Sequence, residues 1–234
     1  MPVTTAVPSA APGAPAPRAP RPGLFISFEG GDGVGKTTQI AALAEHLEAQ
    51  GVEHLVTREP GGTGLGAQIR GLLLDGGHVA PRAEALLYAA DRAHHVETLV
   101  RPALDRGAVV LTDRYLDSSV AYQGAARSLG VAEVRDLSLW ATGGLLPDLT
   151  ILLDADPLLA ARRTSGRGRA DRLEREGEAF RAALREQFLA LAAAEPQRFR
   201  LIDAARPVPE IAGAVRGAVE PLLAGRTARA GERA

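Results

Sequence analysis

The chain has 234 residues, a hydrophobic fraction of 46%, a formal net charge of −1 and no cysteine. This length allows one large domain or two small ones, and the apolar fraction supports a sizeable core. The near-zero charge excludes a general attraction to nucleic acid or to an anionic membrane, and the lack of cysteine excludes disulfides and thiolate metal sites. No apolar run approaches the roughly 18 residues of a membrane span. We therefore expect a cytoplasmic protein that binds neither nucleic acid nor membrane.

The N-terminal residues 1–22 are rich in proline and alanine and lack the apolar core of a signal peptide. Proline at this density is incompatible with a helix or a central strand, so we expect a disordered tail. Such a tail is either a dispensable extension or a partner-docking segment. The folded domain is predicted over residues 23–224, with residues 225–234 as a second loose end.

Apolar runs and helical patterns alternate along the predicted domain. The expected strands are 24–28, 54–57, 108–112, 149–153 and 199–202. A helix is predicted over 37–50, and another over 82–103, which Pro102 helps to terminate. The runs are continuously apolar, which is typical of strands covered on both sides. The fold class is therefore α/β, a doubly wound five-stranded parallel sheet with helices on both faces and ligands at the C-terminal strand ends.

A glycine-rich loop follows the first expected strand and precedes the first expected helix. It fits the pattern G-x-x-x-x-G-K-[ST] in full. Backbone N–H groups of such a loop wrap around phosphate oxygens, and the helix N-terminus adds partial positive charge. This P-loop NTPase motif predicts that the chain binds ATP. The predicted ATP-binding residues are Gly30, Gly31, Asp32, Gly33, Val34, Gly35, Lys36, Thr37 and Thr38.

Three of these positions have a chemical role at a bound nucleotide. Lys36 can reach the β and γ phosphates, and Thr37 offers a hydroxyl to Mg²⁺. Asp113, at the end of the third expected strand, supplies a carboxylate for the same ion. We therefore predict Lys36 as catalytic, and Thr37 with Asp113 as the site of a Mg²⁺ cofactor.

The segment from about 162 to 174 is rich in arginine and contains two glycines, Gly166 and Gly168. A charged run of this kind is often only a solvated surface. The glycines favour a mobile lid instead, since a positively charged flap can stabilise the charge that develops during phosphoryl transfer and exclude water.

Beyond the loop, several stretches occur in a fixed order: 57–63, 88–92, 113–124, 147–150 and 162–174. Together they resemble the bacterial thymidylate kinases, which are P-loop nucleoside monophosphate kinases. The resemblance extends from Leu24 to about Ile211 and leaves only the two tails outside. It implies the ATP-dependent phosphorylation of dTMP to dTDP by a homodimer.

The resemblance also implies a set of acceptor-binding residues. Arg114 is expected to bind the acceptor phosphate, Tyr88 to stack on the thymine in place of the usual phenylalanine, and Tyr122 to crowd the sugar 2′ position. Asp32 is expected near the 3′-hydroxyl. The full predicted set is Asp32, Arg58, Glu59, Tyr88, Arg92, Arg114, Ser119, Tyr122, Gln123 and Glu174. Alternatively, Glu174 simply begins the next helix, and Tyr88 and Arg92 are ordinary core and helix-surface residues.

Thymidylate kinases place a catalytic arginine either in the phosphate loop or in the lid. The loop of this chain has none and its lid has several, so the chain resembles the lid-arginine type. We expect Arg114 and Arg167 to be catalytic, with Arg163, Arg169 and Arg172 as rivals to Arg167. Other readings are a kinase for a different nucleoside monophosphate and, from another class, a nucleotide switch or ATPase that acts on a protein partner.

Overall fold

A computed structural model describes residues 23–164, 172–173 and 176–231. Its single described sheet has five parallel strands in the order β2-β3-β1-β4-β5. The strands are β1 (Leu24–Glu29), β2 (His54–Arg58), β3 (Val109–Asp113), β4 (Leu149–Asp154) and β5 (Phe199–Asp203). The five predicted strands and their parallel arrangement are confirmed. Because the chain crosses from β3 over β1 to β4, a ligand crevice is expected at the C-terminal ends of these central strands.

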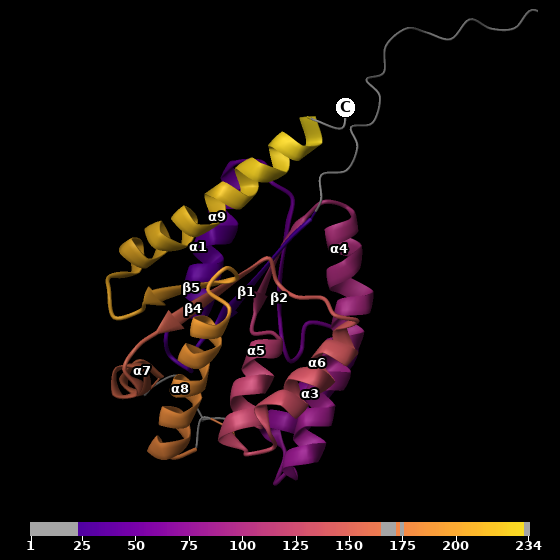
Figure 1. Cartoon of the computed structure of the whole chain (residues 1–234), viewed down its shortest axis with the longest axis vertical. Helices are drawn as coiled ribbons and strands as arrows, with labels where there is room; N and C mark the ends of the chain where they lie inside the picture. Colours follow the sequence, from indigo (N-terminus) through magenta and orange to yellow (C-terminus); the bar gives the residue numbers. More distant parts are fainter. Residues whose placement is uncertain (1–22, 165–171, 174–175, 232–234) are drawn as a thin grey trace, which may run out of the picture.

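Helices cover both faces of the sheet, as Figure 1 shows. The helical elements are α1 (Lys36–Ala49), α2 (Gly64–Arg70), η1 (Gly71–Asp75), α3 (Pro81–His95), η2 (Val96–Val100), α4 (Arg101–Asp105), α5 (Leu116–Ser119), η3 (Val120–Ala126), α6 (Val131–Thr142), α7 (Pro157–Thr164), α8 (Glu178–Ala194) and α9 (Val208–Gly231). The three η elements are π-helical. None of the described helices has both the length and the apolar composition needed to cross a bilayer.

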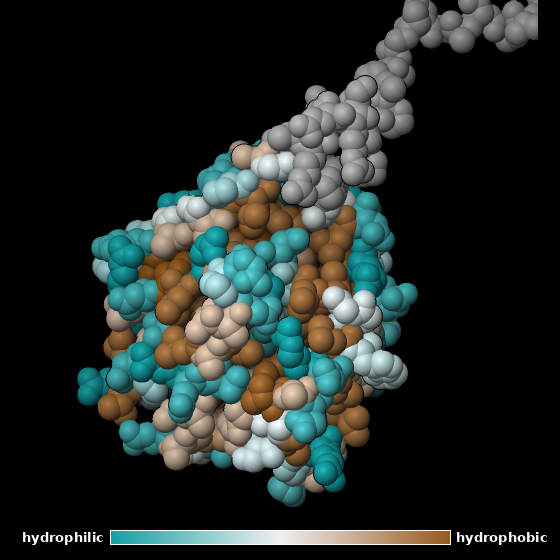
Figure 2. All heavy atoms as spheres, in the orientation of Figure 1, coloured by the Kyte–Doolittle hydropathy of each residue, from teal (hydrophilic) through white to brown (hydrophobic). Residues whose placement is uncertain are grey.

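Successive side chains of the strands point to opposite faces of the sheet, which creates two separate hydrophobic cores. Leu24, Ile26 and Phe28 of β1 pack with α1 and α9. Phe25, between them, points to the other face and packs with η2, α5, η3 and α8. Both faces of β1 are therefore buried, which explains why its sequence is continuously apolar rather than alternating. At the surface in Figure 2, by contrast, polar side chains are interleaved with apolar ones.

Two predicted boundaries are wrong. Pro102 does not help to end the helix predicted over 82–103: the π-helical segment η2 precedes it, and α4 continues to Asp105. A wider turn tolerates a residue that has no N–H to donate. The second boundary is that of the C-terminal tail, which was predicted to be loose from Gly225. In the structure α9 continues through Gly225 and ends at Gly231. Arg226 holds this part of α9 by donating to the carbonyl of Gly107.

Candidate functional site

The glycine-rich loop lies at the C-terminal end of β1 and leads directly into α1. Gly30 has a φ of 127°, and a Cβ there would lie 2.3 Å from the carbonyl oxygen of Leu153, so only glycine fits. Gly35, with a φ of 100°, precedes the first residue of α1. The loop therefore aims backbone N–H groups and a helix N-terminus at one point, as an anion site requires.

Lys36 lies folded against this loop. Its ammonium donates to the carbonyls of Gly30 at 3.1 Å and Gly31 at 2.8 Å, and the residue is 7% exposed. Burial, followed by the charge of Arg114, lowers the pKa of Lys36. Lys36 is also the only lysine in the chain. The loop thus holds a single, largely desolvated amine beside its phosphate-binding backbone.

The predicted metal-site pair is brought together. The hydroxyl of Thr37, in the first turn of α1, donates to a carboxylate oxygen of Asp113, at the end of β3, over 3.2 Å. Among the described residues there is no cluster of three or more histidine or acidic side chains that could hold a metal by itself. A hydroxyl with one carboxylate is the donor set of a Mg²⁺ ion that also keeps waters and phosphate oxygens as ligands, so these residues fit that ion.

Asp32, Arg114 and Tyr122 form a closed group across the loop. Arg114 pairs with Asp32 at 2.5 Å, and the hydroxyl of Tyr122 donates to the other oxygen of Asp32 at 3.2 Å. The guanidinium of Arg114 also lies 5.1 Å from the ring centre of Tyr122. Burial acts to raise the pKa of Asp32, but the charges of Arg114 and Lys36 outweigh it, and the pKa is lowered. Asp32 is therefore held as a carboxylate between two cations.

The backbone around Arg114 is held in an unusual conformation. Arg114 has a φ of 69°, a left-handed value that is uncommon for a residue with a side chain. The residues beside it are tied to Glu29, the last residue of β1, whose carboxylate accepts from the N–H of Tyr115 at 2.8 Å and from the hydroxyl of Ser118 at 2.6 Å. Burial, and then the charge of Asp117, raises the pKa of Glu29 to about 7. Glu29 thus positions Arg114, a role that the sequence analysis missed although an acid directly before the glycine loop was visible.

Two predicted acceptor residues, Glu59 and Arg92, are buried in a network behind the crevice. Arg92 is 1% exposed and pairs with Glu59 at 2.7 Å. The second oxygen of Glu59 contacts the ring of His95 at 2.8 Å, and the other ring nitrogen contacts the hydroxyl of Thr57 at 2.7 Å. Both residues therefore anchor the segment after β2 to α3. Arg58, in contrast, ends β2 as an exposed residue.

The predicted base-reading residues line two facing helical surfaces. Tyr88 of α3 packs with Ile69, Leu73 and Leu74 and is 9% exposed. Ser119 accepts from Arg92 at 3.0 Å, and Gln123 donates to the buried carboxylate of Glu84 at 2.8 Å. Glu84 was not predicted, although it lies four residues before Tyr88 and therefore on the same face of α3.

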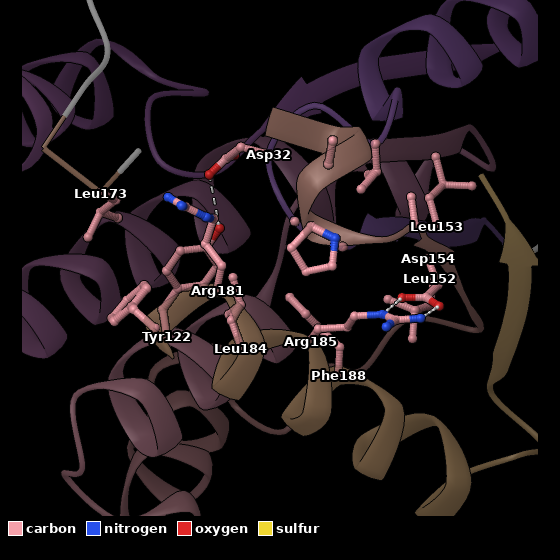
Figure 3. A pocket seen from close by; sticks show the side chains of 17 residues that line it. Asp32, Tyr122, Leu152, Leu153, Asp154, Leu173, Arg181, Leu184, Arg185 and Phe188 are labelled. Atoms are coloured by element: carbon pink, nitrogen blue, oxygen red, sulfur yellow. Dashed lines mark hydrogen bonds and ion pairs between the residues drawn. The ribbon is translucent and has the colours of Figure 1, made fainter. Parts of the chain in front are cut away.

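A cavity joins the loop to α8. It has a volume of about 750 Å³, including space open to solvent, and is lined by Gly30, Gly31, Asp32 and Tyr122 on one side. Figure 3 shows Arg181 of α8 pointing to Asp32 and Tyr122. Arg185 also lines the cavity but is turned to Asp154, which accepts from it at 2.7 and 2.8 Å. Arg181, which also donates to the carbonyl of Glu176, is thus a cation in the wall of this cavity that the sequence analysis missed.

The arginine-rich segment is only partly described. Arg167, Arg169 and Glu174 lie outside the described residues. Arg163 donates to the carbonyl of Ala204 at 2.9 Å, and Arg172 pairs with Glu84. In this conformation neither of these two arginines points into the cavity beside the loop.

Comparison with known proteins gives one consistent result. A family model described as thymidylate kinase matches residues 28–215. A thymidylate kinase of Leifsonia xyli is 66% identical over 84% of this chain and 94% of its own length. The thymidylate kinase of Clavibacter michiganensis is 63% identical over 86% of this chain and 97% of its own length, and that of Deinococcus radiodurans is 50% identical over 84% and 96%. The P-loop at the end of β1, the parallel sheet and these matches together show that the chain belongs to the thymidylate kinase family.

Proposed function

We propose that the crevice above β1 and β3 transfers the γ-phosphoryl group of ATP to dTMP and so forms dTDP. The observation that carries this proposal is the group of Asp32, Arg114 and Tyr122. This group supports the proposal because its cation, Arg114, lies beside the glycine loop, where it can bind a second phosphate next to the donor nucleotide.

Electrostatics and positioning account for the catalysis. The acceptor oxygen belongs to a phosphate that is already anionic, so no strong general base is required. Lys36 and the loop N–H groups hold the donor phosphates, while Arg114 draws the acceptor phosphate into line. Arg114 can exchange its present partner, Asp32, for the acceptor phosphate, which frees that carboxylate for the acceptor sugar.

Mg²⁺ is the cofactor that we assign to Thr37 and Asp113. The hydroxyl of Thr37, in the first turn of α1, lies 3.2 Å from a carboxylate oxygen of Asp113, at the end of β3. Bound there with ATP, Mg²⁺ would neutralise charge on the β and γ phosphates. Asp113 holds the hydroxyl of Thr37 in position for that role.

The arginine that stabilises the transferred group is proposed to be Arg167. Arg163 and Arg172, two of its rivals, have other partners. Arg181 is proposed as a second cation at the same place: its guanidinium donates to the carbonyl of Glu176, and its side chain faces Asp32 from the first turn of α8. A cation on a regular helix is held beside the loop by the fold itself.

We also propose that the enzyme is a cytoplasmic homodimer. Large apolar side chains are exposed on η1, α3 and α6: Leu72 is 59% exposed, Leu86 59% and Trp140 82%. Solvent-exposed residues of this size on neighbouring elements are typical of a surface that another chain covers.

A coupled assay of ADP release tests the proposed reaction. The enzyme is supplied with ATP and Mg²⁺, and with dTMP, dUMP, UMP, CMP, AMP or GMP, or with no acceptor. We expect strong turnover with dTMP, weaker turnover with dUMP and turnover near the blank for the ribonucleotides. High turnover in the blank would favour an ATPase or switch, and equal turnover with another acceptor would favour a different nucleoside monophosphate kinase.

A further inference from the structure

One terminal nitrogen of the Arg114 guanidinium is fully bonded to the protein. Its Nη1 donates to the carbonyl of Gly30 at 3.0 Å and to the hydroxyl oxygen of Ser118 at 3.1 Å. A guanidinium has five N–H groups, of which two belong to Nη1. Both N–H groups of this nitrogen therefore have partners before any ligand binds.

The opposite edge of the same guanidinium is left for a ligand. Within the described part of the chain, Nη2 bonds only to Asp32 and Nε makes no hydrogen bond. Asp32 and Gly30 both line the cavity beside the glycine loop, and the side chain of Arg114 is 16% exposed. Nε and Nη2 lie on one edge of a guanidinium and can bind two oxygens of a phosphate in parallel.

Glu29 determines how the hydroxyl of Ser118 is oriented. Ser118 lies in α5, is 7% exposed, and donates to a carboxylate oxygen of Glu29 at 2.6 Å. A serine hydroxyl has one proton, and its other partner, the guanidinium of Arg114, can only donate. The proton of Ser118 therefore points to Glu29, and a lone pair of its oxygen points to Arg114.

We propose that Ser118 is a positioning residue, which occupies Nη1 of Arg114 so that the Nε and Nη2 edge is presented to the phosphate of the acceptor nucleotide. Because Ser118 is itself held by a buried carboxylate, it cannot turn to another partner, and the guanidinium is fixed before the acceptor binds. This role is separate from the hydrogen bond by which Glu29 holds the backbone of Tyr115. The inference rests on the role proposed for Arg114 above.

The Ser118→Ala variant tests this role. Burial raises the pKa of Glu29 to about 7, so measurements at pH 8 keep it ionised. We expect the dissociation constant and the KM for dTMP to rise about tenfold, as the loss of a hydrogen bond to a charged group implies. The dissociation constant for ATP, measured by calorimetry, should change less than about twofold, since Lys36 and the glycine loop are untouched.

Ser27→Ala is the matched control. It also removes a buried serine hydroxyl close to Glu29, but that hydroxyl is bonded to Thr150 at 2.9 Å and not to Arg114. The control should keep the wild-type affinity for dTMP. An equal loss of dTMP affinity in both variants would show a general effect on the fold and would overturn the proposal.

Ser118→Cys separates the hydrogen bond from the space that the side chain fills. A thiol is close in size to the hydroxyl, but its sulfur is a weak acceptor. We expect dTMP affinity to fall as in Ser118→Ala, and this variant takes the place of Ser118→Ala if the latter does not fold. Wild-type dTMP affinity in either folded variant would overturn the proposal.

A double-mutant cycle shows whether Ser118 acts through Arg114. In the Arg114→Met background, Ser118→Ala should raise the dissociation constant for dTMP less than about twofold further. A tenfold rise in both backgrounds would mean that Ser118 acts without Arg114, and would overturn its positioning role.

Failure of the foundation gives different results. Wild-type enzyme that does not phosphorylate dTMP contradicts the proposed function before any variant is compared. If wild-type enzyme phosphorylates dTMP but Arg114→Met leaves dTMP affinity unchanged, Arg114 does not bind the acceptor phosphate, and the role of Ser118 falls with it.

Discussion

The donor half and the acceptor half of the crevice are built by different means. Lys36 reaches the carbonyl of Gly31, five residues away, so the donor side is made by consecutive residues and their backbone. On the acceptor side Arg92 and Glu59 are 33 residues apart and Gln123 and Glu84 are 39 apart. The donor half is a local motif that a short sequence can specify. The acceptor half is a buried polar network, which is stable only when every member is present.

Charge also distinguishes the glycine loop from the acceptor half. Asp32, in the glycine loop, lies between Arg114 and Lys36, whose charges outweigh burial and lower its pKa. In the acceptor half, burial, and then the charge of Glu59, raises the pKa of Asp91 to about 6. One oxygen of Asp91 accepts from the N–H of Gly61 at 3.2 Å, and the other is buried without a partner. The first carboxylate is held ionised by its neighbours, whereas ionisation of the second costs stability.

The largest expected effect is at Lys36 in the donor half. Lys36→Ala removes the ammonium at the phosphates, and we expect kcat/KM with dTMP to fall by about a thousandfold or more. The melting temperature should change little by comparison. Arg206→Gln, which removes a surface charge paired with Glu210, is the control and should behave as wild type. A loss of less than about tenfold for Lys36→Ala would refute the placement of the donor phosphates.

Arg114 lies where the two halves meet. Arg114→Lys keeps a positive charge, but a lysine cannot bind a phosphate with two parallel hydrogen bonds. Loss of the guanidinium also removes the present partner of Asp32. We expect kcat/KM for dTMP to fall about a hundredfold, while the affinity for ATP alone, measured by calorimetry, changes less than about threefold. If ATP affinity fell as much as kcat/KM, Arg114 would belong to the donor half instead.

Arg181, on α8, tests whether the opposite wall of the cavity also contributes to catalysis. Arg181→Gln should lower kcat about tenfold, because one cation near the transferred group is lost. Arg185→Gln is a control from the same helix and cavity wall whose guanidinium is bound to Asp154 rather than turned to the loop. Steady-state assays of both variants decide the point. Equal effects would mean that Arg181 acts on the stability of α8 and not on the phosphates.

Asp91 gives a test by stability rather than activity. A raised folded-state pKa means that the folded state binds the proton more tightly, so this group lowers the free energy of unfolding as pH rises from about 4 to 6. Asp91→Asn removes that contribution. Relative to wild type, the free energy of unfolding of the variant should rise by at most about 3 kcal/mol across this window and stay constant above it.

Urea unfolding at several pH values measures this difference. Glu29, whose pKa is raised to about 7, contributes a slope of the same sign to both proteins and cancels in the comparison. A difference between variant and wild type that does not depend on pH would show that Asp91 titrates normally.

The smallest expected effect on catalysis is at the exposed surface, outside both halves. Trp140→Glu places a charge on the proposed dimer face, and sedimentation equilibrium should show weaker association. Turnover per subunit should change less than about twofold, since Trp140 is 82% exposed and is not among the residues that line the crevice. A wild-type protein that sediments as a monomer would contradict the homodimer.

The contrast between the halves also explains what could be predicted from the sequence. The strands, their parallel arrangement and the glycine loop are local or periodic signals, and all are confirmed. The burial of Arg92 and Glu59, and the contacts of Glu29 and Glu84, depend on which residues meet after folding, and their side-chain types alone suggest exposed positions. The resemblance implied a set of acceptor residues but gave no sign of Glu29 and Glu84, the buried carboxylates that accept hydrogen bonds beside them.

A single-turnover experiment with enzyme in excess over ATP labelled at the γ-phosphate tests the central claim most directly. In the presence of dTMP and Mg²⁺, the account predicts that the label appears in dTDP, with little in inorganic phosphate, and that the labelled ATP persists when dTMP is omitted. Label that appears in inorganic phosphate at the same rate with and without dTMP would contradict transfer across the Asp32 and Arg114 contact.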